Sequence, residues 1–329
     1  MSRTQKILVY LLGVVIGVMI LTWFPRPERE EHPWRERTAP DGYYPLEYTD
    51  AAGRTLNLRW QPRLLVSLAP SVTEILFAME IGDQLIGATD WCNEPPAARK
   101  VERIGQMSEP NREVLMRLRP DLVIGSNLTP RRVYDQLDGL GLKSVMLPFD
   151  DYDDVLRGIR DIGRLTGLPA SAARLHFALE RRRQAILEQV GDRTGPRVAL
   201  LYDLENLPSA GSGSWPDDFL RQLGTVNIAR EAPSAWPRLS LEGVAAGDPE
   251  VIVLLADLRS QEQRTVAQER VARLRDRPVW RDMTAVREGR VHIVDASLFL
   301  IPGPRIIDAL EALARAIYPD LAFEESDRD

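Results

Sequence analysis

Two patterns of apolar positions recur along most of the chain. Short apolar runs such as LLVSL, DLVIGS and EVIVLLA have the length of buried strands, and each is followed by a stretch with helical spacing. Repeated strand and helix units of this kind are typical of a mainly parallel sheet that is covered on both faces. The sequence therefore predicts the α/β class. Residues 46–60 differ, because they alternate around Asp50–Gly53 and predict a short hairpin.

One longer helical pattern separates two series of these units. Pro169 suits the first turn of a helix, and the apolar residues that follow fall on a single stripe. They are Ala172, Leu175, Leu179, Ile186 and Val190. A helix of about 23 residues would be about 35 Å long. The pattern therefore predicts one long helix that bridges two lobes.

The two series of units resemble each other locally. The spacing from Glu113 to Pro120 equals that from Glu242 to Pro249, and 129 residues separate each residue from its counterpart. An internal duplication explains this offset, although coincidence within a common helix–proline–strand unit is the alternative. We predict two similar α/β lobes with a ligand cleft between them. The predicted boundaries are an N-terminal lobe 46–167, a bridging helix 168–192, a C-terminal lobe 193–319 and an acidic tail 320–329.

The N-terminal segment carries the information about location. Residues 7–24 are almost entirely apolar and follow Arg3 and Lys6. As a helix this run would reach about 27 Å, which is near the thickness of a bilayer core. No small-residue cleavage site follows it, so we predict that residues 1–24 form an uncleaved transmembrane helix and that residues 25–45 form a tether. The body would then be periplasmic and anchored to the inner membrane. A cleaved signal and a soluble periplasmic protein are the alternative.

Composition excludes several classes of protein. The chain has 42 Lys and Arg against 48 Asp and Glu, and this acidic balance argues against nucleic-acid binding. A single cysteine, Cys92, excludes an internal disulfide framework and a CxxC site. The three histidines are too far apart to predict a metal site.

Signatures of catalysis are missing from the sequence. It contains no GxGxxG, no phosphate-binding GK[ST] loop, no GxSxG and no HExxH. We therefore predict a binding protein without catalytic residues or a cofactor. We also expect the protein to be a monomer. The alternative is an extracytoplasmic two-lobed enzyme, which would need a titratable cluster in the cleft. Only scattered acids are available there, namely Asp90, Asp203 and Glu205.

Aromatic residues are the best candidates for ligand contacts. Four of them lie at the ends of predicted strands or just before helices, where open α/β sheets bind ligands. They are Trp91, Tyr202, Trp236 and Phe299. Flat rings suit a large planar ligand, although each of these rings could instead pack within its own lobe. We expect Trp215 and Trp280 to be structural.

Three glutamates deserve separate interpretation. Glu113 and Glu242 lie in the first turns of predicted helices, and the helix dipole alone would explain either one. Their equivalent placement predicts more, namely one carboxylate per lobe that docks on basic residues of a two-fold partner. Glu74 completes the capping-box pattern Ser71-Val-Thr-Glu74, and we expect it to serve only as a cap.

Longer motifs point to a family. RLLVSLAPSVTEILFAMEIGDQLIGATDW, the pair NREVLMRLRPDLVIGSN and LSLEGVAAGDPEVIVLL, and PGPRIIDALEALA resemble the substrate-binding proteins of ABC importers for vitamin B12, ferric siderophores and haem. The resemblance covers about residues 46–318 and is strongest to the vitamin B12-binding members. It implies two Rossmann-like lobes bridged by one helix, with an ABC permease dimer and its ATPase as partners.

The resemblance also implies roles for single residues. The four aromatic residues fall where the vitamin B12-binding members surround the corrinoid, and Glu113 and Glu242 fall where these members engage permease arginines. Other positions depart from the pattern: Met107 and Ser126 replace tryptophans, and Ser297 and Ile301 replace polar ligand contacts. We expect Met107 and Ser126 still to contact the ligand, as the residues they replace do. The implied function is to bind a corrinoid in the cleft and deliver it to a permease. A ferric-siderophore or haem receptor, or a receptor that only senses or stores its ligand, is the alternative.

Overall fold

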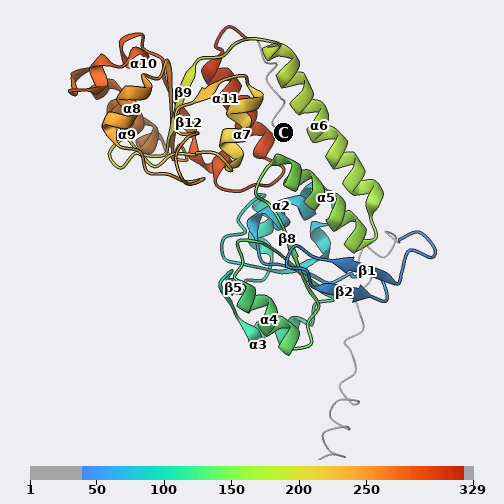
Figure 1. Ribbon diagram of the computed structural model, residues 1–329. Helices are drawn as coiled ribbons and strands as arrows, with labels where there is room; N and C mark the ends of the chain where they lie inside the picture. Colours follow the sequence, from blue (N-terminus) through green and yellow to red (C-terminus); the bar gives the residue numbers. More distant parts are fainter. Residues whose placement is uncertain (1–38, 322–329) are drawn as a thin grey trace, which may run out of the picture. The chain divides into compact units, whose positions relative to one another are not determined.

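Two parallel sheets organise the computed structural model, which describes residues 39–321 (Figure 1). The N-terminal sheet has the strand order β4 (Leu85–Ala88), β3 (Leu65–Ser67), β7 (Leu122–Ser126) and β8 (Ser144–Leu147). The C-terminal sheet has the order β10 (Val226–Asn227), β9 (Arg197–Leu201), β11 (Val251–Ala256) and β12 (Val291–Asp295). All neighbouring strands in both sheets are parallel. The predicted α/β class with parallel sheets is confirmed.

Both sheets have the same topology. If the four strands of each sheet are numbered along the chain, they lie side by side in the order second, first, third and fourth. The third strands, β7 and β11, are buried almost throughout because helices cover both faces of each sheet. The order reverses between the first and third strands, and open sheets bind ligands beyond the carboxyl ends of the strands at such a point.

Helices surround the two sheets. We call the elements from β1 to α5 the N-terminal lobe and those from β9 to α11 the C-terminal lobe. The helices of the N-terminal lobe are α2 (Pro70–Ala78), η2 (Gly82–Gln84), η3 (Pro96–Lys100), α3 (Arg112–Leu118), α4 (Arg131–Gly139) and α5 (Tyr152–Thr166). Those of the C-terminal lobe are α7 (Trp215–Gln222), α8 (Leu241–Gly247), α9 (Gln261–Ala272), η4 (Arg273–Asp276), η5 (Trp280–Asp282), α10 (Thr284–Arg287), η6 (Ala296–Phe299) and α11 (Ile306–Ile317).

The long helix α6 (Pro169–Val190) connects the lobes. Its 22 residues agree with the sequence pattern, and four of the five predicted stripe residues are buried: Ala172, Leu179, Ile186 and Val190. Helix α5, which the sequence interpretation did not identify, packs against α6. The lobe boundaries themselves stay a prediction.

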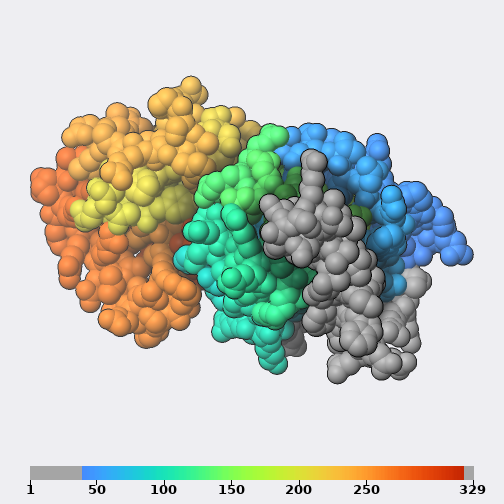
Figure 2. All heavy atoms as spheres, turned by 90° about the horizontal axis from the view of Figure 1, so that it is seen from below, coloured from blue at the N-terminus to red at the C-terminus, as the bar shows by residue number. Residues whose placement is uncertain are grey.

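One hydrophobic core is shared by both lobes. It extends from Leu65 and Ile124 in the N-terminal sheet through Ile159 on α5 to Val253 in the C-terminal sheet. Smaller clusters cover the other face of each sheet, and Trp280 is a buried member of the one in the C-terminal lobe. This burial agrees with the structural role predicted for Trp280. In a space-filling view the yellow and orange C-terminal lobe lies beside the teal and green N-terminal lobe (Figure 2).

The two segments related by the offset of 129 residues have the same local structure. Asn111 caps α3 by accepting hydrogen bonds from two backbone amides, and Ser240 caps α8 in the same way with one. Both helices end in a left-handed residue, Arg119 with φ 48° and Asp248 with φ 34°. A buried proline and a central strand follow each of them.

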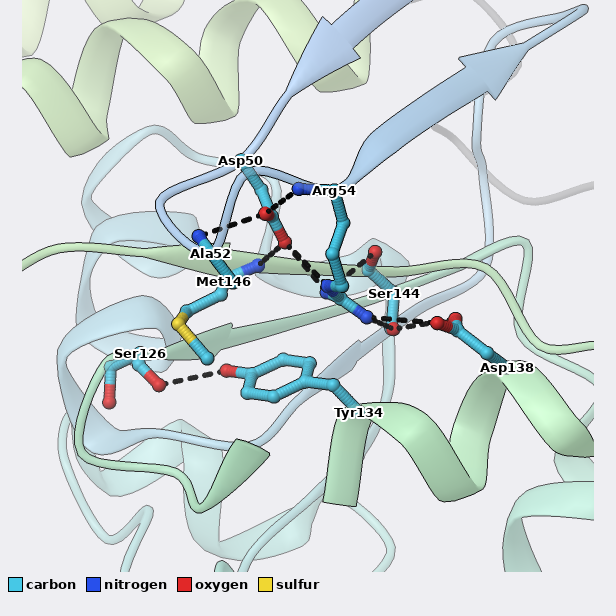
Figure 3. Close-up of polar contacts among 8 residues, drawn as sticks. All are labelled: Asp50, Ala52, Arg54, Ser126, Tyr134, Asp138, Ser144 and Met146. Atoms are coloured by element: carbon cyan, nitrogen blue, oxygen red, sulfur yellow. Dashed lines mark hydrogen bonds and ion pairs between the residues drawn. The ribbon is translucent and has the colours of Figure 1, made fainter. Parts of the chain in front are cut away.

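A predicted hairpin precedes the N-terminal sheet. Strands β1 (Leu46–Thr49) and β2 (Thr55–Leu58) pair in antiparallel fashion, and a second small hairpin joins β5 (Gly105–Gln106) to β6 (Glu109–Pro110). The buried Asp50 carboxylate fixes the first turn, because it accepts hydrogen bonds from the backbone amides of Ala52 and Arg54 and from the Met146 amide of β8 (Figure 3). The Arg54 guanidinium also donates to Asp50 at 2.7 Å and lies 4.7 Å from the ring centre of Tyr134.

Removing this carboxylate is expected to loosen the hairpin. Asp50→Ala leaves three backbone amides and the Arg54 guanidinium without their acceptor, so we expect a loss of about 3 kcal/mol in the free energy of unfolding. Urea denaturation followed by circular dichroism measures this loss. Asp138→Asn is the matched control, since Asp138 pairs with the same arginine at 3.1 Å but is largely exposed, and it should cost less than about 1 kcal/mol. Equal losses in both variants would contradict the role of Asp50.

The capping role predicted for Glu74 is wrong. Helix α2 begins at Pro70, its N-cap is Ala69 and no side chain caps it, so Ser71 already lies inside the helix. Glu74 is instead buried and paired with Arg305. None of the described helices is long and apolar enough to span a membrane. The predicted transmembrane segment 1–24, most of the tether 25–45 and most of the tail 320–329 lie outside the described residues.

Candidate functional site

A cavity of about 390 Å³ lies where the carboxyl ends of strands from both lobes meet. The N-terminal lobe contributes Leu128 after β7 and Phe149 after β8, and the C-terminal lobe contributes Tyr202 after β9 and Leu300 after β12. This is the edge at which parallel sheets bind ligands, and the volume is within the usual range for small-molecule sites. We call this cavity the ligand cleft.

Aromatic pairs form the wall of the ligand cleft in the C-terminal lobe. Trp215 and Phe299 are stacked at 5.3 Å between ring centres and are almost completely buried. Tyr202 and Trp236 meet edge to face at 6.2 Å, and Trp236 keeps 55% of its surface exposed. The structure therefore brings together three of the four predicted aromatic residues. Trp215, which we expected to be only structural, also lines the cleft from the first turn of α7.

The hydroxyl of Tyr202 has an unusual environment. It is buried and makes no hydrogen bond with any described residue. Burial raises the pKa of Tyr202, so the phenol stays neutral at physiological pH. An unmatched buried hydroxyl costs about 1 to 3 kcal/mol. Because this hydroxyl is buried, it is not open to a ligand in the cleft that Tyr202 lines.

Trp91 and Met107 are not among the residues that line the ligand cleft. Trp91 lies beyond the end of β4, is 65% exposed and donates a hydrogen bond from Nε1 to Oε1 of Gln106 at 2.9 Å. Met107 is half-buried in the turn between β5 and β6. Any contact of these two residues with a ligand stays a prediction.

Ser126 shapes the cleft indirectly. It ends β7 with only 1% of its surface exposed, and its carbonyl accepts a hydrogen bond from the Tyr134 hydroxyl at 2.8 Å (Figure 3). Its hydroxyl accepts one from the amide of Leu128 at 3.3 Å. These bonds hold the loop that presents the exposed side chain of Leu128 to the cleft. Ser126 itself offers almost no surface to a ligand, so its predicted contact role stays untested.

Charge is sparse in the ligand cleft. Asp150, which accepts a hydrogen bond from Asn127 at 2.7 Å, is the one charged residue among the described residues that line it. No Lys, Arg, His, Cys or Met of residues 39–321 contributes to this lining. The same part of the chain holds no group of acids, histidines and cysteines suited to a metal ion. The cleft therefore suits a flat, mostly neutral ligand better than a strongly anionic one.

The scattered acids of the C-terminal lobe are engaged elsewhere. Burial tends to raise the pKa of Asp203, but hydrogen bonds from Arg270 and from two backbone amides lower it to about 2. Glu205 makes a two-pronged ion pair with Arg277, with both distances at 3.0 Å. Neither carboxylate lines the ligand cleft, so they do not form the titratable cluster that an enzyme would need there.

Glu113 and Glu242 occupy equivalent positions. Each is exposed in the first turn of a seven-residue helix, α3 or α8. Neither makes an ion pair with another residue of the described range 39–321. Both carboxylates are therefore free to meet a partner, although nothing within the chain tests that role.

The family of the chain follows from comparison with known proteins. The sequence model of the periplasmic binding protein family matches residues 65–298. The chain belongs to this family. Its members are substrate-binding components of ABC importers that work outside the cytoplasm and are not enzymes. The predictions of an extracytoplasmic binding protein and of a non-enzymatic function are thereby confirmed.

Individual relatives differ in their ligands. The ABC transporter substrate-binding lipoprotein YvrC of Bacillus subtilis is 27% identical over 86% of this chain and 88% of its own length. A cobalamin-binding protein of Halobacterium salinarum is 28% identical over 84% of this chain and 74% of its own length. The periplasmic haem-binding protein RhuT of Roseiflexus sp. RS-1 has a TM-score of 0.65 at 26% identity, covering 78% of this chain and 98% of RhuT.

Proposed function

We propose that this periplasmic binding protein captures a corrinoid such as vitamin B12 in the ligand cleft and delivers it to an ABC permease. The carrying observation is the lining of the cleft, which is aromatic on one wall and without a basic residue among those described. A corrinoid brings neutral amide groups around a flat macrocycle and carries its own cobalt ligands. Such a ligand needs aromatic surface and hydrogen-bond partners more than it needs protein charges.

The competing ligands make other demands. Haem carries two carboxylates and takes an axial ligand such as His, Cys, Met or Tyr from the protein. Anionic ferric siderophores would require a cluster of arginines or lysines. The Tyr202 phenol and the 26% identity to RhuT favour haem as the second candidate. The burial of the Tyr202 hydroxyl and the absence of any cation in the described lining favour the corrinoid.

The partner and the membrane attachment complete the proposal. Glu113 and Glu242 would engage basic residues on the two halves of a permease dimer, since they are equivalent, exposed and unpaired with described residues. Residues 1–24 would hold the protein at the outer face of the inner membrane, and the chain would act as a monomer. The relative YvrC is a lipoprotein, which supports membrane attachment of this chain as well. No cysteine lies near residue 24 to accept a lipid, so the attachment would use the N-terminal helix instead.

Calorimetric titration with cyanocobalamin, haemin and a ferric siderophore tests the ligand. We expect cyanocobalamin to bind with a Kd of about 1 μM or lower, which corresponds to at least about 8 kcal/mol. The other two compounds should bind at least tenfold more weakly. Binding of haemin without binding of cyanocobalamin would overturn the corrinoid assignment and leave the family unchanged.

A further inference from the structure

An ion pair between a buried glutamate and a partly exposed arginine joins the two lobes beside the ligand cleft. Glu74 lies on α2 of the N-terminal lobe with 5% of its surface exposed, and Arg305 lies just before α11 of the C-terminal lobe. Nη2 of Arg305 donates to Oε1 of Glu74 at 2.6 Å, and Nε donates to Oε2 at 3.0 Å. Two parallel bonds of this kind fix the direction as well as the distance between the partners.

Arg305 ends the loop that forms one wall of the ligand cleft. Leu300 and Pro302 of this loop line the cleft, whereas Pro304 and Arg305 line a second cavity of about 320 Å³ together with Glu74. Residues 300–305 therefore separate two cavities. The ion pair lies at the end of this partition, where it can set how far the wall projects toward Leu128 and Phe149 on the opposite lobe.

The loop approaches Glu74 closely at a second point. A Cβ atom added to Gly303 would lie 3.1 Å from Oε2 of Glu74, which is closer than an ordinary van der Waals contact. The glycine thus lets the backbone of the loop pass directly over the carboxylate. The side chain of Glu74 therefore bonds to the end of the wall and lies close to its middle.

Stability alone is a poor reason for this arrangement. Burial raises the pKa of Glu74, and the hydrogen bond and charge of Arg305 oppose this effect without cancelling it. A buried ion pair is often no more stabilising than two apolar side chains of the same volume, but it fixes one geometry. That property matters where a wall must hold a position.

We infer that Glu74 and Arg305 are positioning residues that hold residues 300–305 as the wall of the ligand cleft and thereby set the affinity for the ligand. Neither residue lines the ligand cleft itself. The inference rests on the proposed function only for the choice of ligand, since the placement of the wall is a property of the ligand-free protein.

Glu74→Gln tests the effect on affinity, measured by titration of the full-length protein in detergent with cyanocobalamin. If the wall keeps its binding position in only about a tenth of the Glu74→Gln molecules, the Kd of this variant rises about tenfold. Arg182→Gln is the matched control, because Arg182 also joins two helices through two carboxylates at 2.9 Å and has a similar exposure, 37% against 35% for Arg305. The control should keep the wild-type Kd. An unchanged Kd in Glu74→Gln would overturn the inference.

A double variant separates positioning from simple stability. Glu74→Met combined with Arg305→Met replaces the ion pair by apolar groups. This double variant should have a thermal midpoint close to that of the wild type but should lack the fixed geometry of the ion pair. We expect its Kd to stay about tenfold high. Recovery of both the midpoint and the Kd would mean that the pair is merely structural. Gly303→Ala keeps both charges but presses on Oε2 of Glu74, and it should raise the Kd by a smaller factor.

Spin labels test the wall without any ligand. Labels at Arg131→Cys and Glu231→Cys, which are exposed residues in different lobes, report the distance between the lobes by pulsed electron resonance. The native Cys92 is buried and should not react. Glu74→Gln should broaden the distance distribution of the ligand-free protein, and an unchanged distribution would contradict the inference. If the wild type binds no cyanocobalamin, the proposed function fails but this measurement still decides the role of the ion pair.

Discussion

Uptake of the ligand is expected to disappear when Glu113 and Glu242 are both replaced by arginine, while the Kd for cyanocobalamin stays unchanged. Both side chains are exposed, equivalent by position and unpaired with described residues, and neither lines the ligand cleft. On a partner surface that presents basic residues, two reversed charges would meet like charges, and each such contact costs several kcal/mol. The same substitutions leave the aromatic wall untouched.

Uptake of labelled cyanocobalamin by cells that carry the cognate permease measures this effect. Each single reversal should lower the rate about tenfold, because one glutamate still docks. Glu47→Arg combined with Glu231→Arg is the matched control, since these exposed glutamates change the net charge equally without occupying the equivalent helices. Wild-type uptake by the Glu113→Arg and Glu242→Arg double variant would remove the docking role.

The second large effect is expected at Trp236. Its ring lines the ligand cleft and keeps 55% of its surface exposed, so a bound macrocycle could cover it. Aromatic residues at the centre of a binding site commonly contribute about 2 kcal/mol or more, which is about a thirtyfold change in Kd. Trp236→Ala should therefore weaken cyanocobalamin binding about thirtyfold, and its exposure means that the thermal midpoint should change little.

Trp60→Ala provides the control for this measurement. Trp60 is 63% exposed, which is similar to the exposure of Trp236. It lies after β2 near Lys143 and does not line the ligand cleft. Its replacement should leave the Kd at the wild-type value. A similar Kd for both variants would show that Trp236 does not contact the ligand.

Local patterns predicted the architecture well. The strands β7 and β11 are continuous apolar runs, and the helix α6 carries one apolar stripe with helical period, so the type and length of each element can be read from the sequence. The matching of α3 with α8 was also visible, because a first-turn glutamate and a later proline occur at the same spacing in both segments. The left-handed residue that ends each helix was added by the structure. Each of these features depends on residues that are close along the chain.

The cleft was predicted only in part. Tyr202, Trp236 and Phe299 were identified because a residue after a strand lies at the ligand-binding edge of a sheet. The same rule selected Trp91, but it specifies the edge and not the path of the loop, and the loop of Trp91 does not reach the lining of the cleft. Trp215 was expected to be only structural because its stacking on Phe299 is a contact between residues far apart along the chain, which no local pattern reveals.

Glu74 shows why the remaining features were out of reach. Its local sequence matches a capping box, but its partner Arg305 is 231 positions away. A pattern within four residues cannot reveal a contact that the folded chain makes between two lobes. The burial that raises the pKa of Glu74 is likewise a consequence of tertiary packing.

The division between sheets and loops also bears on how such proteins diverge. Phe149, Trp215 and Phe299 belong both to the lining of the ligand cleft and to the shared core. Leu128, Trp236 and Leu300 also line the cleft, but they are exposed loop residues outside that core, so cargo preference can change at these three positions. Substitutions that alter cargo preference therefore need not disturb the packing on which folding depends. A scaffold with this separation can exchange one cargo for another by small steps, each of which leaves a folded protein for selection to act on.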